Sequence, residues 1–518
     1  MMNSSPNRLV VSCQPQKGRQ RAGLRQCTAP SLALVLALLV LAGCGKKAAE
    51  ANDPTPEAAK GFTGVVTSDE PRATLVARNI LAAGGSAADA VAAGTLAMAV
   101  TYPTAVSLGA GGLCVAVDPA RKRADTIEFL PRLPAGGGAV PIPGLLRGLA
   151  MLQGVYGTLR WEAVVSPAEA LARFGERTSR AFVQSVQEAN PPALGDPALA
   201  RLLAGPGGRP RAEGDLLVQN ELAFVLGRVR SAGPTDFYQG QVARQIVADS
   251  ARIGGAIKED DLRGFAAQVT KPIELPFQYA MTVYASPNAR GGATAAWLVE
   301  QGFSPASAFS IQSVGSAKPR EFATSIGQAY RGLEGNAPLF EHGSASISAI
   351  DKDGRAVSCA IGLGRAFGSR KIGSETGILF AATPGIAGDE TPFLAAMVAA
   401  NYTAKQSFAA GAVSGGAPGP AALAQVMIEA FTGKQRINQV IARPRLFQPG
   451  PQAPVMHEAG VDAAMLGAIT QRGVPAVEVR RLGRVTMAVC SNGVPRSPET
   501  CRGGADPRGF GLSAGDEF

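Results

Sequence analysis

Residues 341–361 read EHGSASISAIDKDGRAVSCAI, and the pattern in this stretch is the starting point for the whole chain. From Ser344 to Ile350, small polar residues alternate with apolar ones, which is typical of a half-buried strand. Asp351-Lys352-Asp353-Gly354 follows, and its Asp-Gly pair suits the positive φ angles of a tight hairpin turn. Arg355–Ile361 is predicted to run back as a second, more apolar strand.

Ser344 is therefore expected at the first residue of a strand, directly after Gly343. If the chain is cut between these two residues, one residue carries both a hydroxyl and a free α-amine, and the amine can act as base for the hydroxyl. The chain has two histidines, His342 and His457, and a Ser-His-Asp relay would have to use one of them. On these residues alone, a plain turn serine is the competing interpretation.

The first 43 residues have the pattern of an export signal. Five basic residues and no acidic residue precede the apolar run Leu32–Leu41, which is shorter than the roughly 20 residues of a membrane-spanning helix. Leu41-Ala42-Gly43-Cys44 resembles a bacterial lipobox, so Cys44 is the expected site of lipidation. We expect residues 44–60 to form a lipidated tether that holds the protein in the bacterial periplasm, and Gly45 favours the outer membrane.

Composition and spacing exclude several classes of partner. Removing the leader lowers the formal net charge from +10 to +5, a mild surplus that does not indicate nucleic acid binding. No Cys/His group has zinc spacing, and Asp351–Gly354 lacks the bidentate glutamate of a calcium loop. The glycine-rich stretch Ser107–Gly112 lacks the lysine of a phosphate loop. We therefore expect neither a metal nor a cofactor.

The cysteines suggest an oxidising compartment. Cys490 and Cys501 are close in sequence and are predicted to form a local disulfide. Cys114 and Cys359 each lie in an apolar, strand-like run and are predicted to be plain core residues.

The chain body opens with a recognisable order of elements. Pro71–Ala83 has helical periodicity and stops at Gly84-Gly85, a favourable C-terminal cap. Ser86-Ala87-Ala88-Asp89 is a capping box that opens a second helix, Ala87–Val100. A strand is predicted over Leu113–Asp118.

This order, with the blocks that follow it, resembles the gamma-glutamyltransferase family, a branch of the N-terminal nucleophile hydrolases. These enzymes cut themselves to expose a threonine. The similarity covers nearly all of residues 62–512. The matching blocks are Val140–Gly144, Gly214–Gln219, Gly233–Gly240, Asp260–Leu262, Tyr284–Pro287, Gly291–Gly292, Asp351–Gly354, Phe367–Ser369, Glu375–Leu379, Gly415–Gly416, Arg443–Arg445 and Ala505–Arg508.

The resemblance implies an α+β fold, a four-layer αββα sandwich with helices over two stacked antiparallel sheets. A large part (61–343) and a small part (344–518) would interleave in one globular domain. It also implies acyl transfer of the glutathione hydrolase type, in which the nucleophile attacks a gamma-glutamyl carbonyl of a small molecule and passes the acyl group to water or an amine. Here the nucleophile position is Ser344, and Gly415 and Gly416 stand where the family's oxyanion donors stand.

Several substrate-binding positions depart from the family pattern. The arginine that holds the substrate's α-carboxylate is replaced by Leu130, with Arg132 two residues on. The other replaced positions are Ser346 (a histidine in the family), Gly362 (a threonine), Gly364 (an asparagine), Thr383 and Ile386 (a glutamine and an acidic residue) and Ala395-Ala396 (a serine pair). Two interpretations follow: a serine-dependent enzyme with an altered substrate, or a catalytically degenerate, lipid-anchored scaffold or binding protein.

The replacement at Leu130 leads to a first prediction. A lost charged substrate contact costs about 1–3 kcal/mol, so we expect poor turnover of a gamma-glutamyl anilide. The measurement is anilide release by the purified protein, and robust release at micromolar substrate would contradict the predicted pocket.

Overall fold

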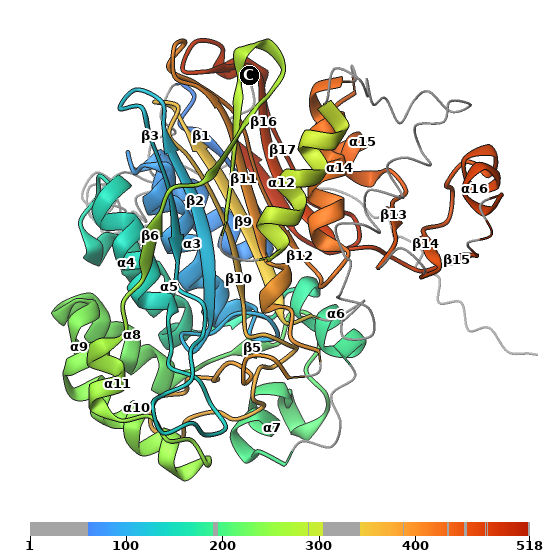
Figure 1. Ribbon diagram of the computed structural model, residues 1–518. Helices are drawn as coiled ribbons and strands as arrows, with labels where there is room; N and C mark the ends of the chain where they lie inside the picture. The colour runs from blue at the N-terminus through green and yellow to red at the C-terminus, as the bar shows by residue number, and fades with distance from the viewer. Residues whose placement is uncertain are drawn as a thin grey trace, which may run out of the picture. The chain divides into compact units, whose positions relative to one another are not determined.

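Two antiparallel sheets lie face to face at the centre of the computed structural model (Figure 1). The structure describes residues 61–189, 195–287, 290–303, 342–386, 388–432, 435–449, 453–471, 473 and 475–515. The predicted signal, the tether and the lipidation site Cys44 lie outside these residues.

Within the described residues the first sheet has seven strands and the second has six. In spatial order, the first sheet contains β18 (Leu512–Gly515), β1 (Gly64–Ser68), β9 (Ser344–Asp351), β10 (Ala356–Gly362), β2 (Gly111–Asp118), β3 (Arg123–Glu128) and β6 (Gln268–Thr270). The second contains β17 (Cys501–Gly504), β16 (Arg484–Val494), β12 (Gln406–Ser414), β11 (Ala395–Asn401), β8 (Thr282–Ala285) and β7 (Ile273–Pro276).

Helices cover both outer faces of this pair of sheets (Figure 1). On the first sheet lie α2 (Pro71–Ala82), α3 (Ala87–Thr101) and α4 (Leu145–Tyr156), with α5 (Trp161–Phe174) packed on α3. On the second lie α12 (Arg290–Phe303), α14 (Gly419–Thr432) and α15 (Ile437–Ala442). The result is the predicted four-layer αββα sandwich.

Smaller elements surround the sandwich. The further helices are α6 (Arg180–Ala189), α7 (Pro197–Leu203), α8 (Asn220–Ala232), α9 (Pro234–Gln239), α10 (Gln241–Arg252), α11 (Glu259–Gly264) and α16 (Ala463–Thr470). The further strands are β4 (Glu176–Arg177), β5 (Leu216–Leu217), β13 (Leu446–Phe447), β14 (Val455–His457) and β15 (Ala476–Glu478). The predicted sandwich did not include these strands, and β14 pairs with β15 in parallel.

The two predicted parts of the chain share the first sheet. Strands β9 and β10 lie between β1 and β2, and β18 pairs with the other edge of β1. A sheet built in this order cannot be divided at residue 343 without separating hydrogen-bonded neighbours. The large and small parts therefore interleave in one folding unit.

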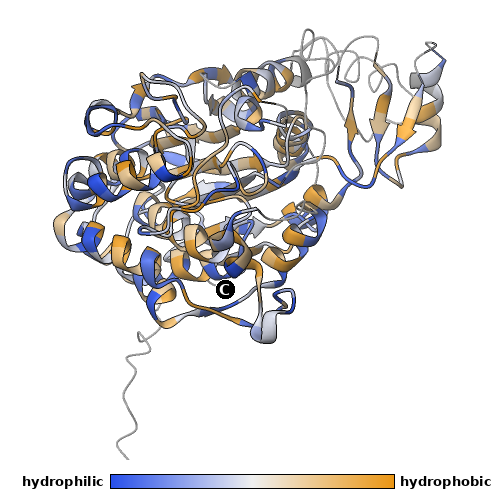
Figure 2. Ribbon diagram, turned by 90° about the horizontal axis from the view of Figure 1, so that it is seen from below, coloured by the Kyte–Doolittle hydropathy of each residue, from blue (hydrophilic) through white to orange (hydrophobic). Residues whose placement is uncertain are grey.

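The opening elements form as their local sequence predicts. Helix α2 spans Pro71–Ala82 and α3 spans Ala87–Thr101, each within a residue of its predicted end. Ser86 and Asp89 form the expected capping box at the start of α3. In Figure 2 the outer helices carry both hydrophilic and hydrophobic residues, as amphipathic helices on a core do.

Strand β9 differs from the prediction because it is buried along its whole length rather than half-buried. Ala345, Ile347 and Ala349 pack into the core cluster under the helices. The opposite, serine-bearing face meets the second sheet instead of water, and Ile350 joins the cluster between the two sheets. The alternation of serine with apolar residues is the same whether the serine face meets solvent or a second protein layer. The sequence pattern alone therefore could not distinguish a half-buried strand from a fully buried one.

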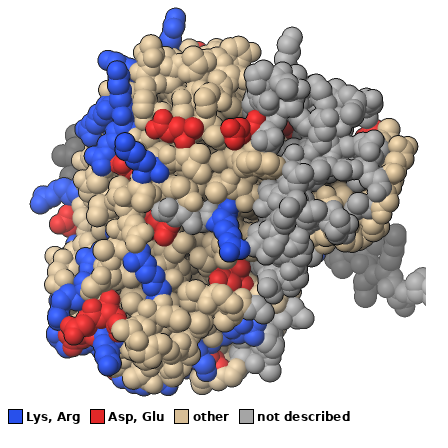
Figure 3. All heavy atoms as spheres, in the orientation of Figure 1, with Lys and Arg blue, Asp and Glu red and all other residues tan. Residues whose placement is uncertain are grey.

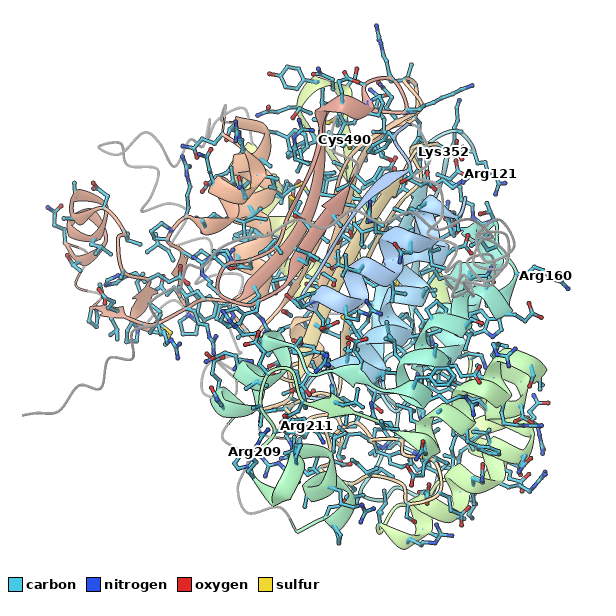
Figure 4. All side chains as sticks on the ribbon, turned by 180° about the vertical axis from the view of Figure 1, so that it is seen from behind. Arg121, Arg160, Arg209, Arg211, Lys352 and Cys490 are labelled. Atoms are coloured by element: carbon cyan, nitrogen blue, oxygen red, sulfur yellow. A yellow bond between two sulfur atoms is a disulfide. The ribbon has the colours of Figure 1, made fainter. Side chains whose placement is uncertain are left out.

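The prediction for Cys114 and Cys359 is wrong, because the two residues form a disulfide. They are directly opposite each other where β2 pairs with β10, so their sulfur atoms meet. Local sequence could not show this pairing across 245 residues. The structure also contains the predicted Cys490–Cys501 disulfide, between β16 and β17; Cys490 is labelled in Figure 4.

On the face shown in Figure 3, positive and negative side chains are interspersed among uncharged surface. A continuous basic stripe, the electrostatic footprint of a nucleic acid site, is not visible on that face. Among the described helices, none combines the length and apolar character needed to cross a membrane.

Asp89 gives a second prediction. Its carboxylate accepts hydrogen bonds from Thr158, Leu159 and Gln153 besides its capping contacts. Burial opposes its ionisation, but the N–H donors of Thr158 and Ser86 outweigh burial and hold its pKa below the usual value. Asp89→Asn should therefore lower the free energy of unfolding by about 2–4 kcal/mol at pH 7, measured by urea denaturation.

The pH dependence follows from the direction of this shift. A carboxyl with a depressed folded-state pKa stabilises the fold above its unfolded pKa of about 3.9 and loses that contribution as the pH falls through the folded value. The difference between Asp89→Asn and the parent should therefore shrink in acid. The exposed Asp260→Asn is the control, with an expected change within about 0.5 kcal/mol; an equal effect of both variants would contradict the assignment.

Candidate functional site

The fold places Ser344 at the first residue of β9, next to Gly362 of β10. Lys352 and Arg121 mark the opposite end of the sheet, where the β9–β10 and β2–β3 turns lie (Figure 4). Since β9 has 8 residues, about 23 Å of strand separates Ser344 from its hairpin turn. Ser344 is 1% exposed, and its side chain starts the serine-bearing face that meets the second sheet.

Glycine is required directly before Ser344. A Cβ atom on Gly343 would lie 2.2 Å from the backbone of Arg365, so no larger residue fits without moving the chain. The Gly343 carbonyl accepts a hydrogen bond from Leu363 N at 2.8 Å. The Gly343–Ser344 peptide is thus pressed closely against the loop that follows β10.

The Ser344 hydroxyl contacts two residues that are distant in sequence, Gly415 and Glu390. Gly415 N donates a hydrogen bond to Ser344 Oγ at 3.1 Å. Gly415 follows β12 with a φ of +93°, which favours glycine and turns its N–H toward Ser344. Gly416 continues the turn, and its carbonyl accepts from Gly419 N at the start of α14. Of the predicted pair Gly415 and Gly416, the structure shows a hydrogen bond to Ser344 from Gly415.

The second group is Glu390, whose importance the sequence did not reveal. Its Oε2 is hydrogen-bonded to Ser344 Oγ, and its Oε1 accepts from Gly343 N at 3.3 Å. Glu390 N donates to Gly364 O at 2.5 Å, which fixes its backbone, and the residue is buried. A sequence signal did exist, because Asp389-Glu390 is the only charged pair between Glu375 and Lys405.

Gly364 stands where the family has an asparagine, and its backbone carbonyl accepts the hydrogen bond from Glu390 N. Its φ is +85°, and an added Cβ would lie 3.2 Å from Asp389 Oδ1. Glu390, four residues beyond Ile386, is the acidic residue that contacts Ser344 in this loop.

A buried arginine holds the backbone of the same serine. Arg484 donates to Ser344 O at 3.1 Å, to Tyr102 OH at 3.0 Å and to Ser414 Oγ at 3.2 Å. Burial acts to lower the pKa of Arg484, but Tyr102 and Asp69 more than offset it and the pKa lies above its usual value. The guanidinium is therefore charged inside the protein.

Asp69 is the nearby carboxyl group. Its Oδ2 accepts from Ser346 N at 2.8 Å, from Ser346 Oγ at 3.1 Å and from Ser414 Oγ at 2.8 Å. Burial raises the pKa of Asp69, while Arg484 and these donors act in the opposite direction. Ser346, which replaces the family histidine, is thus part of the support beneath Ser344.

His342 lies on the other side of the Gly343–Ser344 bond and is turned toward different partners. Its Nε2 is 3.2 Å from Glu188 Oε2 and 3.1 Å from Arg481 Nη2. Burial lowers the pKa of His342 to about 4. His457, the second histidine, contacts the Glu458 carbonyl on β14 through Nδ1.

The remaining substrate positions are mostly apolar in the structure. Leu130 packs against the cluster between the sheets, and the Arg132 guanidinium lies 5.1 Å from the centre of the Phe265 ring. Ala395 and Ala396 are fully buried in β11. None of the described contacts joins these residues to Ser344.

Other predicted positions are occupied as follows. Thr383 Oγ1 donates to Ala139 O at 3.0 Å, and the Ile386 carbonyl accepts from Asp389 N. Gly362 leaves room for the Gly343 carbonyl, since an added Cβ would lie 2.8 Å from that oxygen. In the described part of the chain, no three His, Cys, Asp or Glu residues are grouped so that they could hold a metal ion.

The chain is similar in sequence to a known family of proteins. The family model described as Gamma-glutamyltranspeptidase matches residues 73–313. Human Glutathione hydrolase 7 is 30% identical over 225 residues, covering 40% of this chain and 34% of that protein. The Escherichia coli (strain K12) Glutathione hydrolase proenzyme is 26% identical over 397 residues, covering 62% of this chain and 68% of that protein. The match with the human relative thus covers about a third of that protein's length.

The fold has a close structural counterpart. The crystal structure of cephalosporin acylase from Bacillus halodurans matches with a TM-score of 0.70 at 20% sequence identity, covering 87% of this chain and 95% of that chain. At this identity the likeness concerns the fold. The matched family model and the relatives in sequence show that this chain is similar to the gamma-glutamyltranspeptidase family, over residues 73–313 for the family model.

Proposed function

We propose that this chain is the precursor of an acyl hydrolase or acyltransferase that cuts itself between Gly343 and Ser344. The observation that carries the proposal is the position of Ser344 Oγ, which lies 3.1 Å from Gly415 N and is hydrogen-bonded to Glu390. A serine that served only to fill a turn would not need a left-handed glycine and a buried carboxylate aimed at its hydroxyl.

After the cut, the α-amine of Ser344 takes the proton from its own hydroxyl, as in other N-terminal nucleophiles. Ser344 Oγ attacks the carbonyl of the substrate, forms an acyl-enzyme and passes the acyl group to water or an amine. The N–H groups of Gly415 and Gly416 stabilise the negative oxygen of the tetrahedral intermediate.

The substrate is a small molecule with an amide-linked acyl group related to gamma-glutamyl. The relatives named glutathione hydrolase support a gamma-glutamyl-like donor. The apolar Leu130 supports a donor whose far end carries no carboxylate, because a leucine side chain cannot pair with such a charge.

We also propose that the protein is exported and held by a lipid on Cys44, at the periplasmic side of a bacterial membrane, with the outer membrane favoured. The two disulfides support an oxidising compartment. The alternative is a catalytically degenerate scaffold. It is supported by the buried Ala395 and Ala396, which replace the serine pair of the family.

Self-cleavage predicts a specific gel pattern. With reductant, the purified mature protein should give two fragments, the second beginning at Ser344. Without reductant it should give one band, because Cys114 and Cys359 lie on opposite sides of the cut and remain joined. Ser344→Ala should remain uncut under both conditions, as denaturing gels and N-terminal sequencing would show.

Two control variants make this result specific. Ser348→Ala removes a serine from the same face of β9, where it pairs with Ser358, and should be cut like the parent. Cys359→Ala should give two fragments even without reductant. A single reduced band that persists through long incubation would contradict the enzyme and favour the scaffold.

A further inference from the structure

In the uncut chain, Ser344 has no free α-amine that could take the proton from its hydroxyl. Before cleavage the nitrogen of Ser344 is part of an amide, whose lone pair is delocalised into the carbonyl and is not basic. The amine that serves as base in later turnovers therefore does not yet exist. Another group must take the Ser344 proton in the first reaction.

The described contacts around the Gly343–Ser344 peptide single out one such group. Glu390 contacts both residues at once, through Oε2 to Ser344 Oγ and through Oε1 to Gly343 N. His342 is adjacent in sequence, but its Nε2 contacts Glu188 and Arg481 instead.

A second feature lies on the other side of the same peptide. Leu363 N donates to the Gly343 carbonyl oxygen at 2.8 Å, the atom on which negative charge develops when the carbonyl carbon is attacked. Arg484 holds the next carbonyl, Ser344 O, at 3.1 Å and so fixes the strand on which the hydroxyl sits.

We infer that Glu390 is the catalytic base of self-cleavage and that Leu363 N–H is its oxyanion donor. This inference rests on the proposed function. It assigns the two reactions of Ser344 to different groups: Glu390 and Leu363 act in the cut, whereas the α-amine and the glycines at 415 and 416 act on substrate.

The step balances as follows. The Ser344 Oγ–H bond breaks, its proton passes to Glu390, and Oγ bonds to the Gly343 carbonyl carbon. The resulting oxyanion is held by Leu363 N–H. The bond between Gly343 C and Ser344 N then breaks, and Glu390 returns the proton to the departing nitrogen. This leaves a free amine and an ester, which water hydrolyses to the Gly343 carboxylate and the Ser344 hydroxyl.

The geometry explains why Gly415 assists without being the oxyanion donor of this step. Its N–H points at Ser344 Oγ, so it stabilises the oxygen as the proton leaves. The developing charge on Gly343 O lies against the loop that follows β10, where Leu363 is the donor that the structure gives.

The test is the rate of self-cleavage in full-length protein, followed on reducing gels after synthesis in a cell-free system. General-base catalysis contributes about 100-fold to 10,000-fold, so Glu390→Gln should slow the cut at least about 100-fold relative to the parent. Glu390→Ala should be slowed as much and should recover when formate or acetate is added, because a small carboxylate can enter the vacated space.

Asp389→Asn is the matched control. Asp389 is the acidic neighbour, accepts from Gly385 N and Thr391 N, and makes no described contact with Ser344. It should be cut at the parental rate. Thermal unfolding of each uncut variant checks its fold, and carboxylate rescue of Glu390→Ala distinguishes a missing base from a distorted site.

Hydroxylamine separates the two chemical steps, since it cleaves an ester but not a peptide. Glu390→Gln should stay uncut in hydroxylamine, because no ester has formed. Rapid cutting of Glu390→Gln, or its release by hydroxylamine, would overturn the assignment while leaving self-cleavage itself intact. A parent protein that never cuts would instead overturn the proposed function, and this inference with it.

Discussion

The site depends on one constraint: polar side chains enclosed between two protein layers must find hydrogen-bond partners inside the protein. Strand β9 places the side chains of Ser344, Ser346 and Ser348 on the face that a second sheet covers. Each hydroxyl has a partner, respectively Glu390 with Gly415, Asp69 with Thr486, and Ser358. The burial that makes β9 rigid is therefore also what surrounds its first residue with fixed donors and acceptors.

The buried arginine and carboxyl group beneath Ser344 illustrate how costly such a site is to build. Arg484 and Asp69 are both buried, and they meet through Ser414, which donates to Asp69 and accepts from Arg484. Removing two charges from water costs several kcal/mol per ion unless the geometry compensates. Here the compensation includes hydrogen bonds to the backbone of Ser344 and Ser346, so the charges also orient the strand.

Local sequence was sufficient where the determining interactions are local. The Ser86 and Asp89 capping box, the Asp351–Gly354 turn and the strand alternation from Ser344 all arise from neighbours within a few residues. The resemblance to a known family supplied the layers, which periodicity alone could not. Interactions between distant segments were missed for the same reason: Cys114 meets Cys359 only once β2 pairs with β10, and Glu390 meets Ser344 only after its loop folds back.

The position of the Cys114–Cys359 bridge has a consequence for the protein after a cut before Ser344. The bridge joins neighbouring strands of one sheet, β2 and β10, and one strand belongs to each piece. Heat or denaturant would then release a tethered pair rather than two free chains. Reassembly would be unimolecular, at a rate independent of protein concentration, and pieces from different molecules could not exchange.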